Sequence, residues 1–225
     1  MSVFERTLVL ETAGRVGQAA LAAGPAVVAE ARLEEGRKRA SDLGSAVERL
    51  LKDHGWNARE LTAVVVGLGP GSYTGLRVGL ASAKALAYAT GAAFFGVESF
   101  AAWAHAAPAE ASELSVISDA LKGTVFRRDY RRTPGGWEPA GPLGAATVDE
   151  WLAGLRPGAW VSGPFAASLA ARLPVGVNVG AAHEPRPADV LAAAQAYPWA
   201  VTTDVWTAEP YYLRGSSAEE KARRG

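Results

Sequence analysis

The residues whose types and spacing could do chemistry gather in one turn, at positions 67–75. There the apolar run Val64–Val66 meets the sequence Gly-Leu-Gly-Pro-Gly-Ser-Tyr-Thr-Gly, and a helix is expected from Leu76 to about Tyr88. A strand, a glycine-rich turn and a helix N-terminus form a geometry in which backbone N–H groups receive a phosphate or another anion. The candidate ligand-contacting residues of this turn are Gly69, Gly71, Ser72, Thr74 and Gly75.

Two known phosphate-binding motifs can be compared with this turn, and neither matches it. The Walker loop requires Gly-Lys-Ser/Thr, but here Gly75 is followed by Leu76 and Arg77. The dinucleotide fingerprint requires a third glycine where Thr74 stands. The glycines equally fit a structural or interface use, because they allow a tight turn and a close approach of helix and sheet. Ligand contact and structural use both stay open.

Other chemistry-bearing residues are scattered. His54, His105 and His183 share no helical spacing that would make a metal-binding pair. The chain has no cysteine, and Ser72 does not sit in the Gly-x-Ser-x-Gly elbow of a hydrolase. The sequence therefore predicts no catalytic residue and no metal site.

Two carboxylates, Glu11 and Asp119, each end the first expected strand of one half of the chain. Such positions suit a carboxylate that holds magnesium or faces a phosphate. They also suit the capping of a turn, and this is the interpretation we favour at the level of sequence.

The helix expected after the glycine turn lacks a polar face. From Leu76 to Thr90 only Arg77 and Lys84 are charged, and small residues lie on every side. A surface helix should show a polar side, and this one is too short to span a membrane, so we expect it to be covered on both sides. One cover is its own sheet, and the other is either more of this chain or a second chain.

If the second cover is another chain, we expect this helix, together with parts of the amphipathic helix expected at Ser41–His54, to form the contact. The predicted contact residues are Leu43, Val47, Leu76, Gly79, Leu80, Ala83 and Ala87. A Gly79→Trp change is then expected to block pairing while the monomer folds. Because an uncovered apolar face is a liability, the chain alone could form a homodimer through the same surface.

The composition bounds the class of protein. The 225 residues are 49% hydrophobic and carry 23 acidic and 23 basic side chains. Zero net charge supplies no long-range attraction to nucleic acid or to an anionic membrane, so any contact with RNA is expected to be indirect. Without cysteine, a leader pattern or about 20 uninterrupted apolar residues, the sequence predicts a soluble cytoplasmic protein that is not bound to a membrane.

The first half of the chain is predicted to hold strands and helices in the order βββαβαβα. This order combines an antiparallel hairpin sheet with parallel crossovers. Its strands are expected at Thr7–Leu10, Val16–Ala23, Ala26–Leu33, Leu61–Leu68 and Ala92–Val97, and its helices at Ser41–His54, Leu76–Tyr88 and Ser99–Ala107.

The second half shares this loose plan, although no repeat in the sequence is strong enough to assert. Its strands are expected at Leu114–Asp119, Gly123–Arg131, Ala159–Ser162 and Val175–Val179, and its helices at Val148–Leu155, Phe165–Leu173 and Pro187–Tyr197. The polar break at Pro108–Glu113 predicts a first domain, 1–107, and a smaller second domain, 108–214. The last segment of the second domain could pack back on the first, and 215–225 is predicted to be a disordered tail.

The stretch Val66–Gly79, VGLGPGSYTGLRVG, resembles the signature of the bacterial TsaB family, also called YeaZ, and the similarity extends over nearly the whole chain. Weaker landmarks are Leu8–Ala13, Gly96–Ser99, Asp119–Ala120 and Tyr212–Arg214. The resemblance implies an α/β, actin-like ATPase fold (Hsp70-like, sugar-kinase-like, ribonuclease-H-like). Such a fold has two domains of mixed sheets with flanking helices, here with a reduced second domain.

The same resemblance implies a role in forming threonylcarbamoyladenosine, the tRNA modification beside the anticodon. In that family the paralogue TsaD carries the metal-binding histidines and transfers the threonylcarbamoyl group, whereas TsaB is a non-catalytic scaffold. The implied partners are TsaD, bound through helices of the first domain, and the ATPase TsaE. No cofactor is implied to be tightly bound to this chain, ATP acts in the complex through the partners, and tRNA is contacted indirectly.

Two other functions stay open. One is an independent, ATP-dependent small-molecule kinase of the same fold, and the other, more remote, is a metallopeptidase homologue. Three departures from the family pattern argue against nucleotide binding: Glu11 replaces aspartate, Leu121 replaces arginine, and a Gly-Asp-Gly stretch is reduced to Ser162–Pro164. The longer carboxylate of Glu11 is expected to crowd the phosphate loop.

Overall fold

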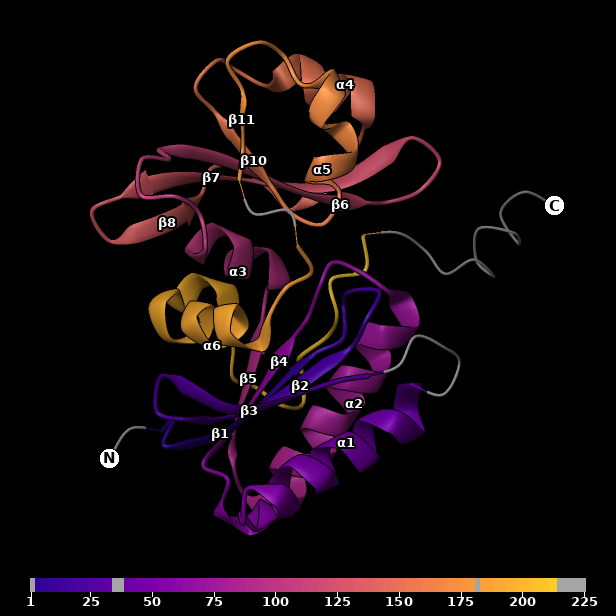
Figure 1. Cartoon of the computed structure of the whole chain (residues 1–225), viewed down its shortest axis with the longest axis vertical. Coiled ribbons are helices and arrows are strands. Elements are labelled where there is room, and N and C mark those ends of the chain that lie inside the picture. The colour runs from indigo at the N-terminus through magenta and orange to yellow at the C-terminus, as the bar shows by residue number, and fades with distance from the viewer. Residues whose placement is uncertain (1–2, 34–38, 181–182, 214–225) are drawn as a thin grey trace, which may run out of the picture.

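The structure of the chain, a computed structural model, describes residues 3–33, 39–180 and 183–213. Two six-stranded sheets form its frame, stacked along the long axis with helices between and outside them (Figure 1). The predicted tail, 215–225, lies outside the described residues.

The first sheet has the strand order β12-β5-β4-β1-β2-β3. The strands β1, β2 and β3 form the predicted antiparallel meander, and β4 and β5 add to β1 in parallel. The strand β12 closes the other edge of the sheet antiparallel to β5, far from it in sequence. The bounds are β1 Arg6–Glu11, β2 Gln18–Ala23, β3 Ala26–Arg32, β4 Ala63–Gly67, β5 Ala93–Val97 and β12 Val201–Thr202.

The second sheet has the order β11-β10-β6-β7-β8, and β9 pairs with the remaining part of β7. Its strands β6, β7 and β8 are antiparallel, and β10 and β11 add to β6 in parallel. This repeats the order of the first sheet from β5 to β3. The bounds are β6 Glu113–Asp119, β7 Thr124–Thr133, β8 Gly136–Pro139, β9 Gly144–Thr147, β10 Trp160–Ser162 and β11 Asn178–Val179.

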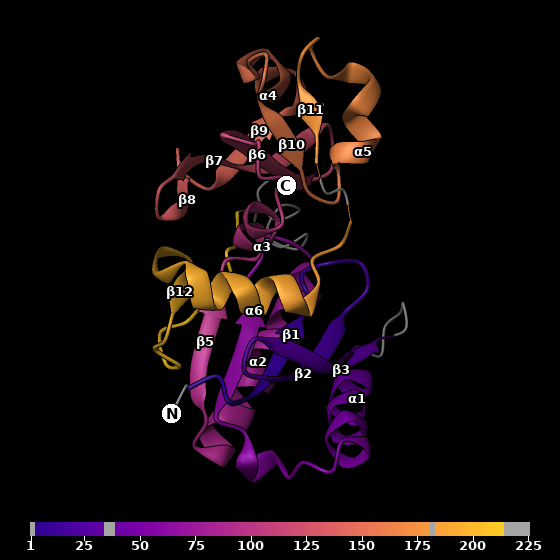
Figure 2. The same cartoon turned by 60° about the vertical axis from the view of Figure 1, so that its left-hand side comes forward.

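The helices complete five layers, which Figures 1 and 2 show from two sides. Helices α1 and α2 cover the outer face of the first sheet, α3 and α6 lie between the sheets, and α4 and α5 cover the outer face of the second sheet. We call the first sheet with α1 and α2 the first lobe, and the second sheet with α4 and α5 the second lobe. The bounds are α1 Arg39–Asp53, α2 Tyr73–Thr90, α3 Ser99–His105, α4 Val148–Gly154, α5 Ala166–Leu169 and α6 Pro187–Ala196, with 3-10 turns at Ala58–Glu60, Ala170–Arg172 and Pro198–Ala200.

The core follows the alternation of the strands. In β1, Leu8 and Leu10 belong to the cluster under α1 and α2, whereas Val9 belongs to the cluster under α3 and α6. This second cluster continues through Leu114 and Val116 into the second sheet, so one apolar core joins the lobes. Each fully buried Leu or Val contributes about 1.5–3 kcal/mol relative to its exposed state.

Most predicted elements are present, with differences that have local causes. Helix α2 begins at Tyr73 rather than Leu76, because the Ser72 hydroxyl accepts a hydrogen bond from the Gly75 N–H and caps the helix at 3.3 Å. The expected helix at 165–173 divides into α5 and a 3-10 turn, and β8 and β9 were not predicted. No helix among the described residues is long and apolar enough to cross a bilayer.

Candidate functional site

The glycine turn after β4 is held tightly against the loop that follows β1. The Ser72 N–H donates to the Ala13 carbonyl at 2.7 Å. A Cβ at Gly71 would stand 2.3 Å from that same carbonyl oxygen, so only glycine permits this approach. The Gly69 N–H donates to the Ser99 hydroxyl at 3.1 Å. These contacts account for the turn as a structural connection between β4, β1 and α3.

Glu11 lies beneath this turn and is 1% exposed. Its carboxylate accepts the Ala13 N–H at 2.7 Å and the Ser99 hydroxyl at 2.8 Å. Burial raises the pKa of Glu11 to about 7, opposed by these two hydrogen bonds, and the negative charge of Glu184 raises it further. Since Ser99 also bonds Gly69, the carboxylate is coupled to the turn from below.

A cleft of about 760 Å³ opens between the lobes beside the turn. Of the predicted ligand-contacting residues, Gly71, Ser72 and Thr74 line it, whereas Gly69 and Gly75 are buried elsewhere. The opposite wall comes from the end of β6, with Ser118 and Asp119, and from the turn that follows it, with Ala120 and Leu121. Aromatic and proline residues make up much of the rest: Pro70, Tyr73, Trp103, Phe126, Pro164, Phe165, Pro185, Tyr211 and Tyr212.

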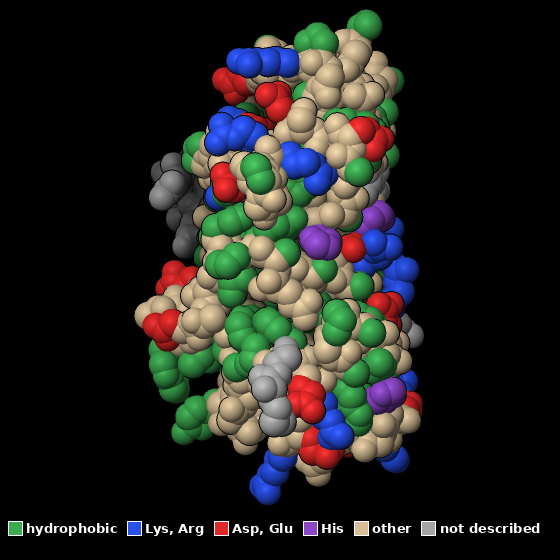
Figure 3. Space-filling model, turned by 90° about the vertical axis from the view of Figure 1, so that its left-hand side faces the viewer, with side chains coloured by type: hydrophobic (Ala, Val, Ile, Leu, Met, Phe, Trp, Pro, Cys, Tyr) green, Lys and Arg blue, Asp and Glu red, His purple; other side chains and the backbone are tan. Residues whose placement is uncertain are grey.

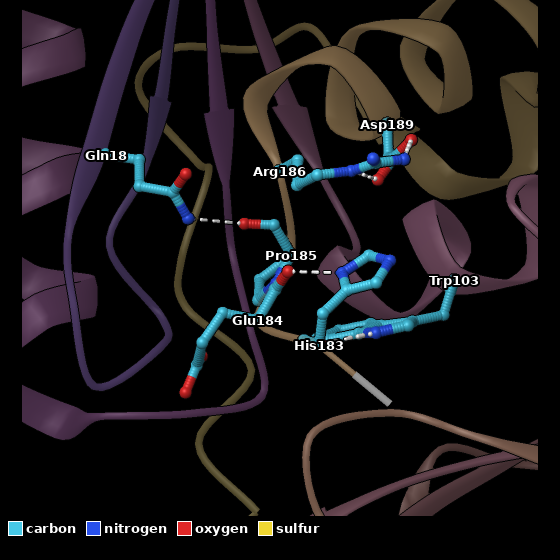
Figure 4. A network of polar contacts seen from close by, with 7 residues as sticks. All are labelled: Gln18, Trp103, His183, Glu184, Pro185, Arg186 and Asp189. Carbon is cyan, nitrogen blue, oxygen red and sulfur yellow. Dashed lines mark hydrogen bonds and ion pairs between the residues drawn. The ribbon is translucent and has the colours of Figure 1, made fainter. Parts of the chain in front are cut away.

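The segment that returns from the second lobe to α6 is fixed at the back of this cleft (Figure 4). Gln18 of β2 donates to the Pro185 carbonyl at 2.8 Å, and the Trp103 indole donates to the His183 carbonyl at 3.0 Å. Arg186 forms a two-pronged ion pair with Asp189 in the first turn of α6, at 2.7 and 2.9 Å. These contacts set the position of Glu184, whose side chain points away from the others in Figure 4.

The three histidines are not brought together. His54 packs edge-on against Trp56, and His105 against Tyr197. The His183 Nδ1 lies 2.6 Å from the Glu184 carbonyl oxygen. Within residues 3–33, 39–180 and 183–213, no group of three His, Cys, Asp or Glu side chains could hold a metal ion.

A buried ion pair joins the lobes. Glu98, which follows β5 and is 2% exposed, pairs with Arg128 of β7 at 2.9 Å. It also accepts the Tyr130 hydroxyl at 2.6 Å. Burial raises the pKa of Glu98, and burial together with the Glu98 charge raises that of Tyr130. From the sequence, Glu98 was identified only as part of a family landmark. No local pattern predicts that it pairs with Arg128, which lies 30 residues further along the chain.

Helix α2 buries one face against its own chain, and the predicted interface residues lie on that face. Leu76, Leu80, Ala83 and Ala87 are at most 7% exposed, and Gly79 is buried with them. On α1, Leu43 and Val47 are buried in the same cluster. The predicted contact residues are therefore wrong as a surface, because the chain's own sheet and α1 already cover that stripe.

The expectation for Gly79→Trp is wrong for the same reason. A Cβ at Gly79 would stand 2.1 Å from the Thr12 hydroxyl oxygen, so a tryptophan there breaks the packing of the monomer. The opposite face of α2 is exposed, so of the two second covers that the sequence left open, the described part of this chain does not supply one. Its exposed residues are Thr74, Arg77, Ala81, Ala85, Tyr88 and Ala89.

Two large aromatic side chains stand beside this exposed face. Tyr88 and Trp206 are 76% and 75% exposed, and their rings meet edge to face at 5.9 Å. Basic and acidic side chains are interspersed on the molecular face shown in Figure 3, and the described residues of that face gather into no continuous basic surface. An exposed pair of large aromatic side chains, such as Tyr88 and Trp206, is common at protein interfaces.

The sequence of this chain is similar to proteins of tRNA threonylcarbamoyladenosine biosynthesis in more than one comparison. Residues 33–179 match the family described as "TsaD: tRNA N6-adenosine threonylcarbamoyltransferase". The chain is 33% identical over 111 residues to the tRNA threonylcarbamoyladenosine biosynthesis protein TsaB of Bacillus subtilis, which covers 49% of this chain and 48% of that protein. It is 29% identical over 186 residues to TsaB of Escherichia coli, covering 78% and 80%. The chain thus spans about half the length of the first curated relatives it matches.

Solved structures show the fold. YeaZ from Pseudomonas aeruginosa superposes with a TM-score of 0.73 at 22% identity, covering 93% of this chain and 100% of that one. The activator of 2-hydroxyisocaproyl-CoA dehydratase from Clostridium difficile superposes with a TM-score of 0.50 at 11% identity, covering 85% and 94%. The predicted fold class, two lobes of mixed sheet with flanking helices in the actin-like ATPase arrangement, is confirmed.

Proposed function

This chain belongs to the TsaD family of tRNA N6-adenosine threonylcarbamoyltransferases, in its TsaB (YeaZ) branch, and from this premise we propose that it acts in tRNA threonylcarbamoyladenosine biosynthesis as an accessory subunit. It binds TsaD, and TsaD transfers the threonylcarbamoyl group to the tRNA. TsaE and ATP act in the assembled complex, and this chain contacts tRNA only indirectly. In the absence of TsaD, the surface of this chain that binds TsaD forms a homodimer instead.

The observation that carries this proposal is the two-sided character of α2. One face is buried in the chain's own core, while the other exposes Ala81, Ala85 and Ala89 on an 18-residue helix. Small side chains allow another helix to approach closely, so that dispersion contacts accumulate along the helix. Tyr88 and Trp206 flank this face, and large aromatic residues are the common anchors of protein interfaces.

The hydrogen bonds that Glu11 makes within the chain agree with an accessory role. Its carboxylate is already bonded to Ser99 and to the Ala13 N–H beneath the turn. A residue held in this way supports the turn and does not face the cleft directly.

The experiment is a quantitative binding measurement between the purified chain and TsaD from the same genome. Ala85→Trp places a bulky side chain on the exposed face of α2, where the monomer has room for it. We expect the dissociation constant to rise at least tenfold, about 1.4 kcal/mol, because a tryptophan prevents close helix approach. Ala153→Trp, at an exposed alanine of α4, is the matched control and should bind TsaD as the wild type does.

Two results would count against the proposal. One is that Ala85→Trp binds TsaD with an unchanged dissociation constant. The other is that the isolated chain transfers the threonylcarbamoyl group, or binds ATP tightly and turns it over. Near-UV circular dichroism of both variants checks that the fold is intact. The homodimer is read from sedimentation of the chain alone, where Ala85→Trp should shift it to monomer.

A further inference from the structure

Two polar atoms at the cleft between the lobes lack any hydrogen-bond partner in the structure. Ser118 at the end of β6 is 7% exposed, and its hydroxyl is unpartnered. One carboxylate oxygen of Glu184, Oε2, is also buried and unpartnered. Both residues line the cleft. A buried acceptor without a donor costs about 1–3 kcal/mol, and a rotation of either side chain toward the cleft would let a ligand that supplies donors remove this cost.

Among the residues that line the cleft, carboxylates outnumber cations by one, and the Arg77 guanidinium lies over the Tyr73 ring of its wall. Among the described residues that line it, Asp119 and Glu184 are acidic and Arg15 is basic. The buried Glu11 lies close enough for the Glu184 charge to raise its pKa. Asp119 accepts the Leu121 N–H at 2.7 Å, which leaves its charge in place at the rim. A phosphate entering here would meet these carboxylates, whereas a cation would relieve their repulsion.

The walls of the cleft suit a flat cation. Phe126 and Phe165 line it from the second lobe, and Tyr73 and Tyr212 line it from the first lobe and the C-terminal segment. One guanidinium already uses the last two: Arg77 lies 4.4 Å over the Tyr73 ring and donates to the Tyr212 hydroxyl at 3.0 Å. Guanidinium groups stack on aromatic faces while directing their N–H donors sideways, which an ammonium cannot do.

We propose that the cleft between the lobes binds a guanidinium group, whose N–H donors bond Glu184 and Ser118 and whose flat face rests on Phe126 and Phe165. The volume of about 760 Å³ exceeds one guanidinium, so the group arrives on a larger molecule. That molecule is either a free alkylguanidine or a protein that inserts an arginine side chain. The inference does not depend on TsaD binding, because Glu184 and Ser118, which bond the guanidinium, do not lie on the exposed face of α2.

The test is calorimetry of the full chain with n-butylguanidinium and with n-butylurea, its neutral counterpart of nearly the same shape. We expect the guanidinium to bind at least tenfold more tightly than the urea. Glu184→Gln keeps the shape of the side chain and removes its charge, and it should abolish this preference. Ser118→Ala should weaken guanidinium binding several-fold. The matched control is Glu209→Gln, at an exposed position outside the cleft, which should leave binding unchanged.

The source of the guanidinium is distinguished by the peptide acetyl-Gly-Arg-Gly-amide and its citrulline analogue. Tighter binding of the arginine peptide than of butylguanidinium supports an arginine from a protein, and weaker binding supports a free alkylguanidine. Equal binding of guanidinium and urea, or an unchanged preference in Glu184→Gln that retains its near-UV spectrum, would overturn the proposal. So would tighter binding of ATP with magnesium in competition with butylguanidinium. The Ala85→Trp variant should bind butylguanidinium as the wild type does, which separates this test from that of the accessory role.

Discussion

The two lobes are built on one plan, and they differ in what happens at the end of the first strand. The orders β5-β4-β1-β2-β3 and β11-β10-β6-β7-β8 correspond strand by strand. In each lobe the first strand ends in a carboxylate that accepts the N–H two residues further on, at 2.7 Å: Glu11 from Ala13, and Asp119 from Leu121. Glu11 is buried with a pKa of about 7, whereas Asp119 is exposed.

The difference shows that surroundings, and not the local bond, decide what such a carboxylate does. Helices α1 and α2 have 15 and 18 residues, whereas α4 and α5 have 7 and 4. The longer helices lie over the first sheet, and Glu11 is enclosed by the glycine turn and Ser99. At the corresponding end of β6, Asp119 lines the cleft between the lobes and is exposed.

The largest expected effect tests whether the second lobe is as tightly built as the first at its strand ends. Gly163, after β10, has φ +108°, and a Cβ there would stand 2.2 Å from the Ile117 carbonyl oxygen. We expect Gly163→Ala to reduce the free energy of unfolding by about 4 kcal/mol, because the backbone conformation and the contact are both unfavourable. Urea denaturation measures this. Gly154→Ala, where a Cβ meets nothing within 4 Å, is the control, and a loss under about 1 kcal/mol in Gly163→Ala would contradict the expectation.

A second prediction concerns the two carboxylates directly. Because the pKa of Glu11 is raised from 4.5 to about 7, the folded chain binds more protons than the unfolded chain between these values. Its stability therefore falls as pH rises from about 4.5 to about 7, by an amount on the order of 3 kcal/mol. Glu11→Gln should remove this fall and exceed the wild type in stability at pH 8.

The matched change in the second lobe, Asp119→Asn, should keep the fall of stability with pH. Thermal unfolding at intervals between pH 5 and pH 8 gives the comparison. If Glu11→Gln and Asp119→Asn have the same profile, the contrast between the lobes does not hold.

The smallest expected effect concerns the contact that joins the lobes. Tyr130→Phe removes the hydroxyl that donates to Glu98 at 2.6 Å. The buried carboxylate keeps Arg128 as its partner, so we expect a loss of about 1–2 kcal/mol in the free energy of unfolding. Tyr88→Phe removes the corresponding hydroxyl from a side chain that is 76% exposed, and it should leave the free energy of unfolding unchanged. Equal effects in the two variants would show that the Glu98 contact does not stabilise the pairing of the lobes.

Much of the fold follows from the sequence, because its strands and helices carry strong periodic patterns. The meander, the crossovers through α1 and α2, and the proline-led start of α6 were all predicted near their observed bounds. The strands β8 and β9 have four residues each and are rich in Gly, Ala and Pro, so their composition does not distinguish them from loops. The two-residue strand β12 exists only because β5 offers it an edge.

The site was harder to predict, for reasons that concern distance along the chain. On α2, apolar residues occur on all sides, so periodicity alone does not tell which face the sheet covers. The sheet covers the face that carries Leu76 and Leu80. The face that carries Ala81, Ala85 and Ala89 stays exposed. Ser118 and Glu184 meet the same cleft from separate segments, and no local signal connects them.

The return of the chain to the first sheet has a consequence for synthesis. The last strand of that sheet, Val201–Thr202, and the helix that covers its inner face, Pro187–Ala196, are translated after the whole second lobe. A nascent chain that has emerged only as far as residue 107 therefore exposes the edge of β5 and the apolar inner surface of its sheet. We expect the first lobe to become fully ordered only after residue 202 has left the ribosome, and so after the whole second lobe has been translated.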